Sequence, residues 1–229
     1  MELNKIYNGD CYELIKQIPD KSVDLIYTDI PYKIDFNKKD SGFRYEDNYA
    51  TTKQAMAQMK NGIDMKILDE FARVLKKMNL FIWCSATQMK EIIDRYSKYK
   101  LYILAWHKTD VPRMNRKQFL TDLEYCLNFK ETGVQYSNTG GYHSRLYESC
   151  TNKYENKKFH HPTTKPSKLV SEHIEFASKP GDLVLDPFSG SGTTCACAKA
   201  LGRNYIGFEL DKTYYEASVE RLMKTGENK

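Results

Sequence analysis

Four residues near the start of the chain, Asp29-Ile30-Pro31-Tyr32, have the types and order needed to hold a flat ring that carries an amine. They close the run 23–28, which has the apolar composition of a strand. The carboxylate and a turn carbonyl can accept the N–H groups of the amine, while the tyrosine ring stacks on the face of the bound ring. A protein that modifies a nucleobase amine needs this geometry, because the base must first leave its stack. Alone, the same residues also fit an ordinary turn.

A glycine-rich turn near the other end of the chain predicts a ligand pocket. Residues 182–188 have the composition of a buried strand, Ser-Gly-Ser-Gly follows at 189–192, and the small residues of a closely packed helix continue over 193–201. Glycines let the backbone approach a ligand, so the pattern fits a nucleotide-like molecule. Cys195 stands where the dinucleotide fingerprint has a third glycine, and the absence of a Lys after the last glycine excludes a phosphate-cradling P-loop.

An acidic residue closes the next predicted strand. Glu209 ends the run 204–209 and follows Asp186 by 23 residues. An acid at the tip of the second strand can accept hydrogen bonds from both ribose hydroxyls of a ligand. The implied ligand is a ribose-bearing cofactor that is not held mainly through phosphates.

The elements that must position these residues alternate along the chain. Apolar residues at helical spacing over 64–75 mark one face of a helix as core. The alternation predicts an α/β fold with a mixed, mostly parallel sheet and helices on both faces. Strands are predicted over 23–28, 80–85, 101–107, 123–129, 183–187 and 204–209, and helices over 11–18, 64–77, 87–98, 166–178, 193–201 and 213–224.

Length and composition predict a single domain over residues 1–229 in the cytoplasm. Charged residues make up 28% of the chain, no run of 18 apolar residues occurs, and the first residues do not resemble a signal peptide. We therefore expect no membrane partner. The six cysteines form no pair of CxxC units, so we expect reduced thiols and no metal site.

Two long polar segments interrupt the alternation, over 33–60 and within 108–160. Loops of this length are functional or disordered. Between His107 and Lys168 there are eleven Lys or Arg and six Asp or Glu, and tyrosines are interleaved with the cations. This composition favours contact with DNA, and the competing interpretation is a solvated loop with routine lysines. The tightest cationic cluster, predicted to grip phosphate, consists of Arg113, Arg116 and Lys117.

Five motifs taken together resemble one family. Asn8-Gly9-Asp10-Cys11, the tetrapeptide at 29–32, His161–Pro166, Asp186–Gly192 and Gly207–Glu209 occur in this order. The set and its order resemble the amino-group DNA methyltransferases that use S-adenosylmethionine, in the permuted (beta) class whose catalytic tetrapeptide precedes the cofactor loop. The resemblance covers nearly the whole chain.

The resemblance implies a Rossmann-like methyltransferase fold and methyl transfer to adenine N6 in a flipped-out base, because an Asp at the first tetrapeptide position favours adenine in this family. Methylation of cytosine N4 or of an RNA base stays open. The family usually has Pro where this chain has Ile30, which keeps the backbone carbonyl but loses the fixed φ of proline. A DNA-binding homologue with impaired catalysis is therefore a further alternative. Double-stranded DNA is the implied partner, with a homodimer and a partner restriction endonuclease left open.

The resemblance also assigns roles to individual residues. Asp29 and the carbonyl of Ile30 would accept the target amine, and the Pro31-Tyr32 pair would shape the turn and stack on the base. Competing interpretations make Asp10 a helix cap and Lys165 a surface residue at a helix start. The implied cofactor contacts are Asp10 with the adenine, Glu209 with the ribose, Asp186, Phe188, Ser189, Gly190, Ser191 and Gly192 with the methionine part, and Thr163 and Lys165 with the carboxylate end.

Overall fold

The computed structural model describes residues 1–32, 62–112, 119–134, 136, 143–158 and 164–225. The loop expected over 33–60 lies outside these residues, as do parts of the segment expected to contact DNA. No helix within the described ranges is long and apolar enough to cross a membrane.

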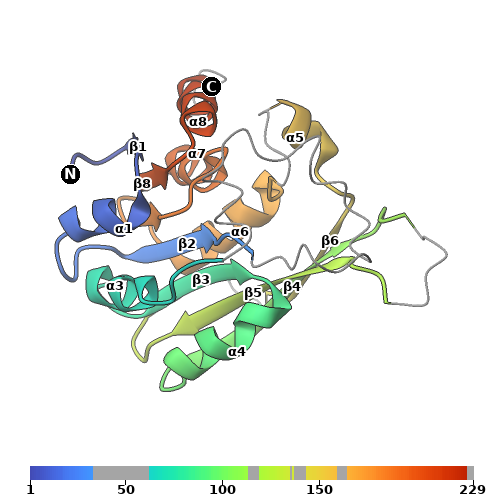
Figure 1. Cartoon of the computed structure of the whole chain (residues 1–229), viewed down its shortest axis with the longest axis horizontal. Coiled ribbons are helices and arrows are strands. Elements are labelled where there is room, and N and C mark those ends of the chain that lie inside the picture. Colours follow the sequence, from blue (N-terminus) through green and yellow to red (C-terminus); the bar gives the residue numbers. More distant parts are fainter. Residues whose placement is uncertain (33–61, 113–118, 135, 137–142, 159–163, 226–229) are drawn as a thin grey trace.

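One sheet of eight strands forms the centre of the molecule, in the order β1-β8-β7-β2-β3-β5-β4-β6 (Figure 1). Only β5 runs antiparallel to its neighbours, so the sheet is mixed and mostly parallel, as predicted. Two short edge strands, the first and the sixth, were not predicted from the sequence. The strands are β1 (Lys5–Asn8), β2 (Leu25–Asp29), β3 (Asn79–Cys84), β4 (Lys100–Lys108), β5 (Leu123–Lys130), β6 (Leu146–Ser149), β7 (Leu183–Asp186) and β8 (Asn204–Glu209).

Helices cover both faces of the sheet (Figure 1). The helix predicted over 11–18 is instead a short α-helix followed by a 3-10 turn at Ile15–Gln17, ahead of Pro19. A short helix in the polar segment, α5, was not predicted. The helices are α1 (Cys11–Leu14), α3 (Ile67–Val74), α4 (Ala86–Arg95), α5 (Lys153–Lys158), α6 (Ser167–Ala177), α7 (Thr193–Ala200) and α8 (Lys212–Lys224).

The core consists of two layers, one on each face of the sheet. Successive residues of β2 point to opposite faces, so Ile26 packs in one layer and Tyr27 in the other. The first layer contains residues of α3 and α4, and the second contains residues of α6, α7 and α8. Strands buried on both faces in this way are typical of parallel sheets covered by helices.

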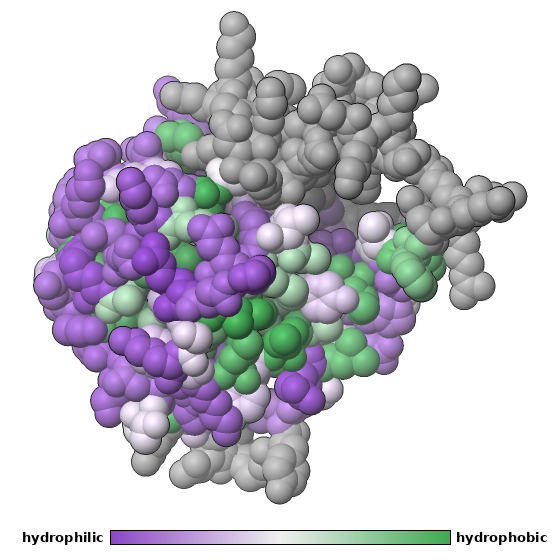
Figure 2. All heavy atoms as spheres, turned by 60° about the horizontal axis from the view of Figure 1, so that its bottom comes forward, coloured by the Kyte–Doolittle hydropathy of each residue, from purple (hydrophilic) through white to green (hydrophobic). Residues whose placement is uncertain are grey.

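Some apolar side chains stay exposed on the strands at one end of the sheet. Ile103 on β4, Leu123 on β5 and Leu146 on β6 are each at least 40% exposed. Figure 2 shows a face of the molecule on which hydrophobic side chains gather among polar ones.

Strand pairing brings three acidic residues to the same edge of the sheet. Asp29, Asp186 and Glu209 are the last residues of β2, β7 and β8, which run parallel and adjacent. In the register, Ile26 pairs with Leu185 of β7. The carboxyl edge of a parallel sheet is where α/β proteins bind ligands, so the topology assembles the residues that the sequence singles out.

Candidate active site

A buried lysine joins the end of β2 to β5. The side chain of Lys165, in the segment before α6, is 6% exposed, and its Nζ forms a short ion pair with Asp29 Oδ2. The same Nζ lies 2.9 Å from Glu124 Oε2 on β5. Glu124 also pairs with Lys108 of β4. We call these residues, together with Tyr32, the catalytic cluster.

The charges of the catalytic cluster follow from burial and pairing. Burial raises the pKa of Asp29, and the ammonium of Lys165 opposes this shift. Burial also disfavours the charged form of Lys165, but the carboxylates of Asp29 and Glu124 outweigh it and raise the pKa of Lys165. For Glu124 the two ammonium groups outweigh burial and lower the pKa to about 2. Lys165 is therefore an ammonium and Glu124 a carboxylate at neutral pH.

The turn after Asp29 is held by packing and hydrogen bonds. The side chain of Ile30 is 1% exposed within the core, and its N–H donates to the carbonyl of Trp83 at 3.2 Å. The Pro31 carbonyl accepts a hydrogen bond from Gln88 Nε2 of α4 at 3.0 Å. Core packing thus fixes Ile30, where the family more often has the rigid ring of proline.

The hydroxyl of Tyr32 points into the catalytic cluster. Lys165 Nζ donates to Tyr32 Oη at 3.3 Å, and the hydroxyl donates to Glu124 Oε2 at 3.4 Å. The ring of Trp83 lies below the ammonium, with its centroid 5.1 Å from Lys165 Nζ. A cation between two aromatic rings and two carboxylates is stabilised in its charged form.

Asp186 and Glu209 connect to the glycine-rich turn through backbone donors. Asp186 Oδ1 accepts hydrogen bonds from Thr28 Oγ1 at 2.8 Å and from the N–H of Phe188 at 3.2 Å. Glu209 Oε2 accepts from the N–H of Gly190 at 2.7 Å, and Oε1 accepts from the N–H of Asp211 at 2.8 Å. Burial raises the pKa of Asp186 to about 6 and that of Glu209 to about 7.

The glycine-rich turn has the backbone that only glycine adopts readily. Gly190 and Gly192 have φ of 51° and 73°, in the left-handed region. Gly192 is the N-cap of α7, and its N–H donates to the Ser189 carbonyl at 2.8 Å. Ser189 in turn donates its N–H to the Phe208 carbonyl at 2.8 Å, which ties the turn to β8.

Asp10 lies beside Glu209 at the same edge. Gly9, the residue before it, donates its N–H to the Glu209 carbonyl at 2.9 Å. Asp10 itself is exposed, and its Oδ1 accepts the N–H of Tyr12 at 2.9 Å, so it caps α1. The cap interpretation is confirmed, and the contact with a cofactor adenine stays a prediction.

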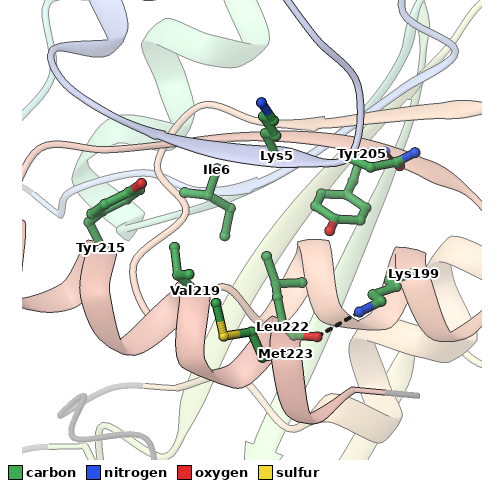
Figure 3. A pocket seen from close by; sticks show the side chains of 9 residues that line it. Lys5, Ile6, Lys199, Tyr205, Tyr215, Val219, Leu222 and Met223 are labelled. Carbon is green, nitrogen blue, oxygen red and sulfur yellow. Dashed lines mark hydrogen bonds between the residues drawn. The ribbon is translucent and has the colours of Figure 1, made fainter. Parts of the chain in front are cut away.

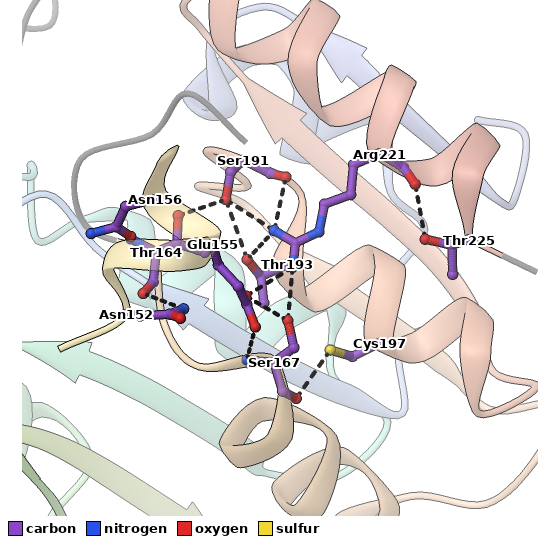
Figure 4. Close-up of polar contacts among 10 residues, drawn as sticks. All are labelled: Asn152, Glu155, Asn156, Thr164, Ser167, Ser191, Thr193, Cys197, Arg221 and Thr225. Atoms are coloured by element: carbon purple, nitrogen blue, oxygen red, sulfur yellow. Dashed lines mark hydrogen bonds and ion pairs between the residues drawn. The ribbon is translucent and has the colours of Figure 1, made fainter. Parts of the chain in front are cut away.

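A second buried ion cluster lies beneath the glycine-rich turn (Figure 4). Arg221 of α8 is 5% exposed, donates to Thr193 Oγ1 at 2.7 Å, and reaches Ser191 Oγ at 3.3 Å. It also donates to Ser167 Oγ at 2.8 Å and pairs with Glu155 Oε2 at 3.3 Å. We call these five residues the Arg221 cluster. It joins α5, α6, the turn and α8.

The structure leaves some sequence-based assignments untested and adds residues that the sequence did not single out. The assigned cofactor residue Thr163 and the cations Arg113, Arg116 and Lys117 lie outside the described residues. Lys165, assigned to the carboxylate end of the cofactor, contacts Asp29 and Glu124. Glu124, Lys108, Gln88 and Arg221 were not singled out from the sequence.

A hollow of about 390 Å³ lies between β1, β8 and the helices α7 and α8 (Figure 3). It is lined by residues at the beginning of β1 and β8, such as Lys5 and Tyr205, by Lys199 near the end of α7, and by one side of α8. Lys199 points across it and donates to the Leu222 carbonyl at 2.7 Å. This hollow is separate from the edge that carries the acidic residues.

Known proteins resemble this chain over most of its length. The family model N6_N4_Mtase, described as DNA methylase, matches residues 23–220. The Type II methyltransferase M.HinfI of Haemophilus influenzae is 31% identical over 99% of this chain and 70% of its own length. The Type II methyltransferase M.BamHI of Bacillus amyloliquefaciens is 30% identical over the full chain, which spans only 59% of that relative.

Solved structures agree with the fold. A crystal structure of the M1.HpyAVI–SAM complex superposes with a TM-score of 0.69 at 27% identity, covering 95% of this chain and 99% of the other. The PvuII DNA methyltransferase, described as cytosine-N4-specific, has a TM-score of 0.69 at 19% identity, covering 97% of this chain and 87% of its own, and shows the likeness of fold alone. The family match and the two relatives, together with acidic residues gathered around a glycine-rich turn, establish that the chain belongs to the N6/N4 family of amino-group DNA methyltransferases, whose methyl donor is S-adenosylmethionine.

Proposed function

We propose that the protein transfers a methyl group from S-adenosylmethionine to adenine N6 in double-stranded DNA. The observation that carries the proposal is the state of Asp29 at the carboxyl edge. Its Oδ1 is buried and has no hydrogen-bond partner among the residues that the structure describes. A buried acceptor without a donor is rare, so the position suits the N–H of an incoming amine. The choice of adenine over cytosine rests on the family resemblance, because an Asp at this position favours adenine in the family.

Asp29 and Ile30 would make the exocyclic amine of the base a better nucleophile. An exocyclic amine is weakly nucleophilic because its lone pair is delocalised into the ring. Acceptance of its N–H groups by Asp29 Oδ1 and the Ile30 carbonyl favours a pyramidal nitrogen and stabilises the positive charge that develops there. Tyr32 would stack on the flipped base, a contact worth about 1–3 kcal/mol.

The balance of the reaction is simple. S-adenosylmethionine supplies a methyl group on a sulfonium, and the nitrogen lone pair forms the N–C bond as the S–C bond breaks. Asp29 accepts the hydrogen bond of the amine proton, which leaves to solvent after transfer. Positioning by the fixed turn at Ile30 supplies much of the rate.

The donor set at the edge fits a ribose-bearing cofactor. Each oxygen of Glu209 already accepts one backbone N–H, and a carboxylate has about four lone-pair sites, so both can accept a ribose hydroxyl as well. We assign the ribose to Glu209, the adenine to Asp10, and the methionine part to Asp186 and the turn of residues 188–192.

The same proposal includes contacts with DNA and a partner restriction endonuclease. Arg113, Arg116 and Lys117 would contact DNA phosphates, because cations of this kind supply the sequence-independent part of DNA affinity. Two relatives carry Type II methyltransferase names, which supports a role beside a restriction endonuclease.

Transfer of radiolabel from S-adenosylmethionine to DNA tests the proposal. The wild-type protein should label double-stranded DNA, and digestion to nucleosides should place the label on adenine. Label on cytosine would move the assignment to N4, and label on RNA alone would overturn the DNA substrate. Asp29→Ala should abolish labelling, whereas Asp94→Ala, an exposed position on α4, should keep it. Full transfer by Asp29→Ala would show that the catalytic site lies elsewhere.

A further inference from the structure

The two oxygens of Asp29 have different surroundings. Oδ2 forms an ion pair with Lys165 Nζ, whereas Oδ1 is buried without a partner among the described residues. Leaving a buried carboxylate oxygen without a donor costs about 1–3 kcal/mol or more. One oxygen is thus fixed by the protein, and the other is kept available.

Lys165 has no donor left for a second role. An ammonium has three N–H donors. The structure gives Lys165 Nζ three acceptors, namely Asp29 Oδ2, Glu124 Oε2 at 2.9 Å and Tyr32 Oη at 3.3 Å. The side chain is 6% exposed, so water does not compete for these contacts. Its position differs from the sequence-based assignment, in which Lys165 lines the carboxylate end of the cofactor.

We propose that Lys165 is a positioning residue for methyl transfer, which fixes Asp29 Oδ2 in its ionised form and reserves Oδ1 for the target amine, while Glu124 holds the ammonium in place. The inference rests on the proposed function and specifies how its catalytic carboxylate is controlled. It also explains why a buried lysine and a second carboxylate lie beside Asp29 at the tip of β2.

Charge balance gives the proposal a measurable consequence. Asp29 and Glu124 carry two negative charges, and Lys165 and Lys108 carry two positive charges. Loss of the Lys165 charge leaves the carboxylates of Asp29 and Glu124 with one cation. An adjacent cation lowers the pKa of a carboxyl by about 1–3 units, so Asp29 would take up a proton at higher pH without it. A protonated Asp29 is a weaker acceptor for the amine.

Other titratable groups also face Asp29, and apart from the substituted Lys165 or Glu124 they are the same in every variant used below. Burial raises the pKa of the Cys84 thiol to about 12, so it stays neutral, and burial raises the pKa of Asp186 to about 6. Differences between variants therefore report Asp29. The groups that face it are Tyr27 on β2, Tyr32 after β2, Cys84 on β3, Glu124 and Cys126 on β5, Lys165 before α6 and Asp186 on β7, with Lys108 of β4 behind Glu124.

The test compares the pH dependence of methyl transfer in Lys165→Met and in wild-type protein. We expect the acid limb of kcat to move up by about 1–3 pH units in Lys165→Met, which lowers the rate on that limb about 10- to 1000-fold, with recovery at alkaline pH. The KM for S-adenosylmethionine should not change. Lys168→Met is the matched control, because Lys168 is 77% exposed on α6 and should keep the wild-type profile.

A second variant should shift the limb in the opposite direction. Glu124 raises the pKa of Asp29 by like-charge repulsion. Glu124→Gln should therefore move the acid limb to lower pH while Lys165→Met moves it higher. A merely structural role, or partial unfolding, would not give shifts of opposite sign.

The outcomes separate this inference from the proposed function. A raised KM for S-adenosylmethionine with an unmoved acid limb in Lys165→Met would overturn the inference and restore the cofactor role. Without any methyl transfer by the wild-type protein the proposed function fails, and the carboxyl ¹³C signal of Asp29, assigned with Asp29→Asn, still tests the inference. Its midpoint should rise in Lys165→Met and fall in Glu124→Gln, and equal midpoints in all three proteins would refute it.

Discussion

The catalytic cluster and the Arg221 cluster are built from the same kinds of contact but differ in one respect. Each buries a cation between segments that are distant in the sequence, Lys165 between β2 and β5, and Arg221 between α5, α6 and the glycine-rich turn. In the catalytic cluster, Asp29 Oδ1 has no donor among the described residues. No atom described in the Arg221 cluster is buried without a partner.

This difference distinguishes a cluster that stabilises the fold from one that is prepared to bind a substrate. A satisfied polar network in a low-dielectric interior rigidifies the elements that it joins. An unsatisfied acceptor lowers stability and persists where a substrate supplies the missing donor. We therefore infer that the Arg221 cluster fixes the glycine-rich turn and that, under the proposed function, the catalytic cluster leaves one oxygen of Asp29 for the target amine.

Removal of Arg221 should have the largest effect on stability. Arg221→Met leaves the carboxylate of Glu155 without its buried cation, so we expect the free energy of unfolding to fall by about 3–5 kcal/mol. Urea denaturation followed by circular dichroism measures it. Arg95→Met is the control, because Arg95 is 42% exposed and its pair with Asp69 is worth about 0–1 kcal/mol. A loss no larger than in the control would mean that the cluster does not support the turn.

Asp29→Asn should have the complementary effect. The amide keeps the size of the side chain but weakens acceptance of the amine, and loss of one preorganised group of this kind lowers kcat about 10²- to 10³-fold. Glu124 remains paired with Lys165, so the unfolding midpoint in urea should fall less than in Arg221→Met. A large loss of stability with nearly normal transfer would reverse the roles of the two clusters.

Glu209 lies between Asp29 and Arg221 in this comparison, because it is half-buried at the functional edge and has donors on both oxygens. Burial raises its pKa from 4.5 to about 7, so the folded state binds more protons than the unfolded state in this range. Stability without cofactor should therefore fall as pH rises from 4.5 to about 7, by at most about 3 kcal/mol from this group. The buried Asp186 adds a decrease of the same sign.

The measurement compares urea midpoints across this pH range in wild-type protein and Glu209→Gln. The variant cannot titrate at this position, so its dependence on pH should be shallower. Its affinity for S-adenosylmethionine should be about 10- to 100-fold lower, because hydrogen bonds to a charged group contribute about 1.5–3 kcal/mol. An unchanged slope would mean that Glu209 stays ionised when buried.

The sequence predicted the edge of the site better than its interior. Asp29, Asp186 and Glu209 each end an apolar run, and the end of a buried strand is a local signal that adjacent residues carry. Glu124 and Lys108 belong to the site only because β5 lies between β3 and β4, and local periodicity does not contain the strand order.

Burial of charged residues was equally hidden from the sequence. An Arg on an amphipathic helix is normally exposed, and Arg221 is buried only because α5 and the glycine-rich turn pack over it. The loss of proline at Ile30 is compensated by tertiary packing, which a tetrapeptide motif cannot show. The permuted class, the single domain and the DNA contacts stay predictions.

Asp10 gives the smallest effect and the sharpest test of the comparison, because it lies at the functional edge yet has a donor. Asp10→Ala removes the cap of α1 and should cost about 1 kcal/mol of stability. Asp10→Ser keeps a capping oxygen but shortens the side chain. It should therefore restore stability without restoring a contact with the cofactor adenine. If Asp10 contacts the cofactor adenine, calorimetry should show weaker binding of S-adenosylmethionine in both variants. If Asp10→Ser binds S-adenosylmethionine with wild-type affinity, Asp10 serves only as a helix cap. A carboxylate at this edge that already has a donor would then stabilise the fold, as the polar groups of the Arg221 cluster do.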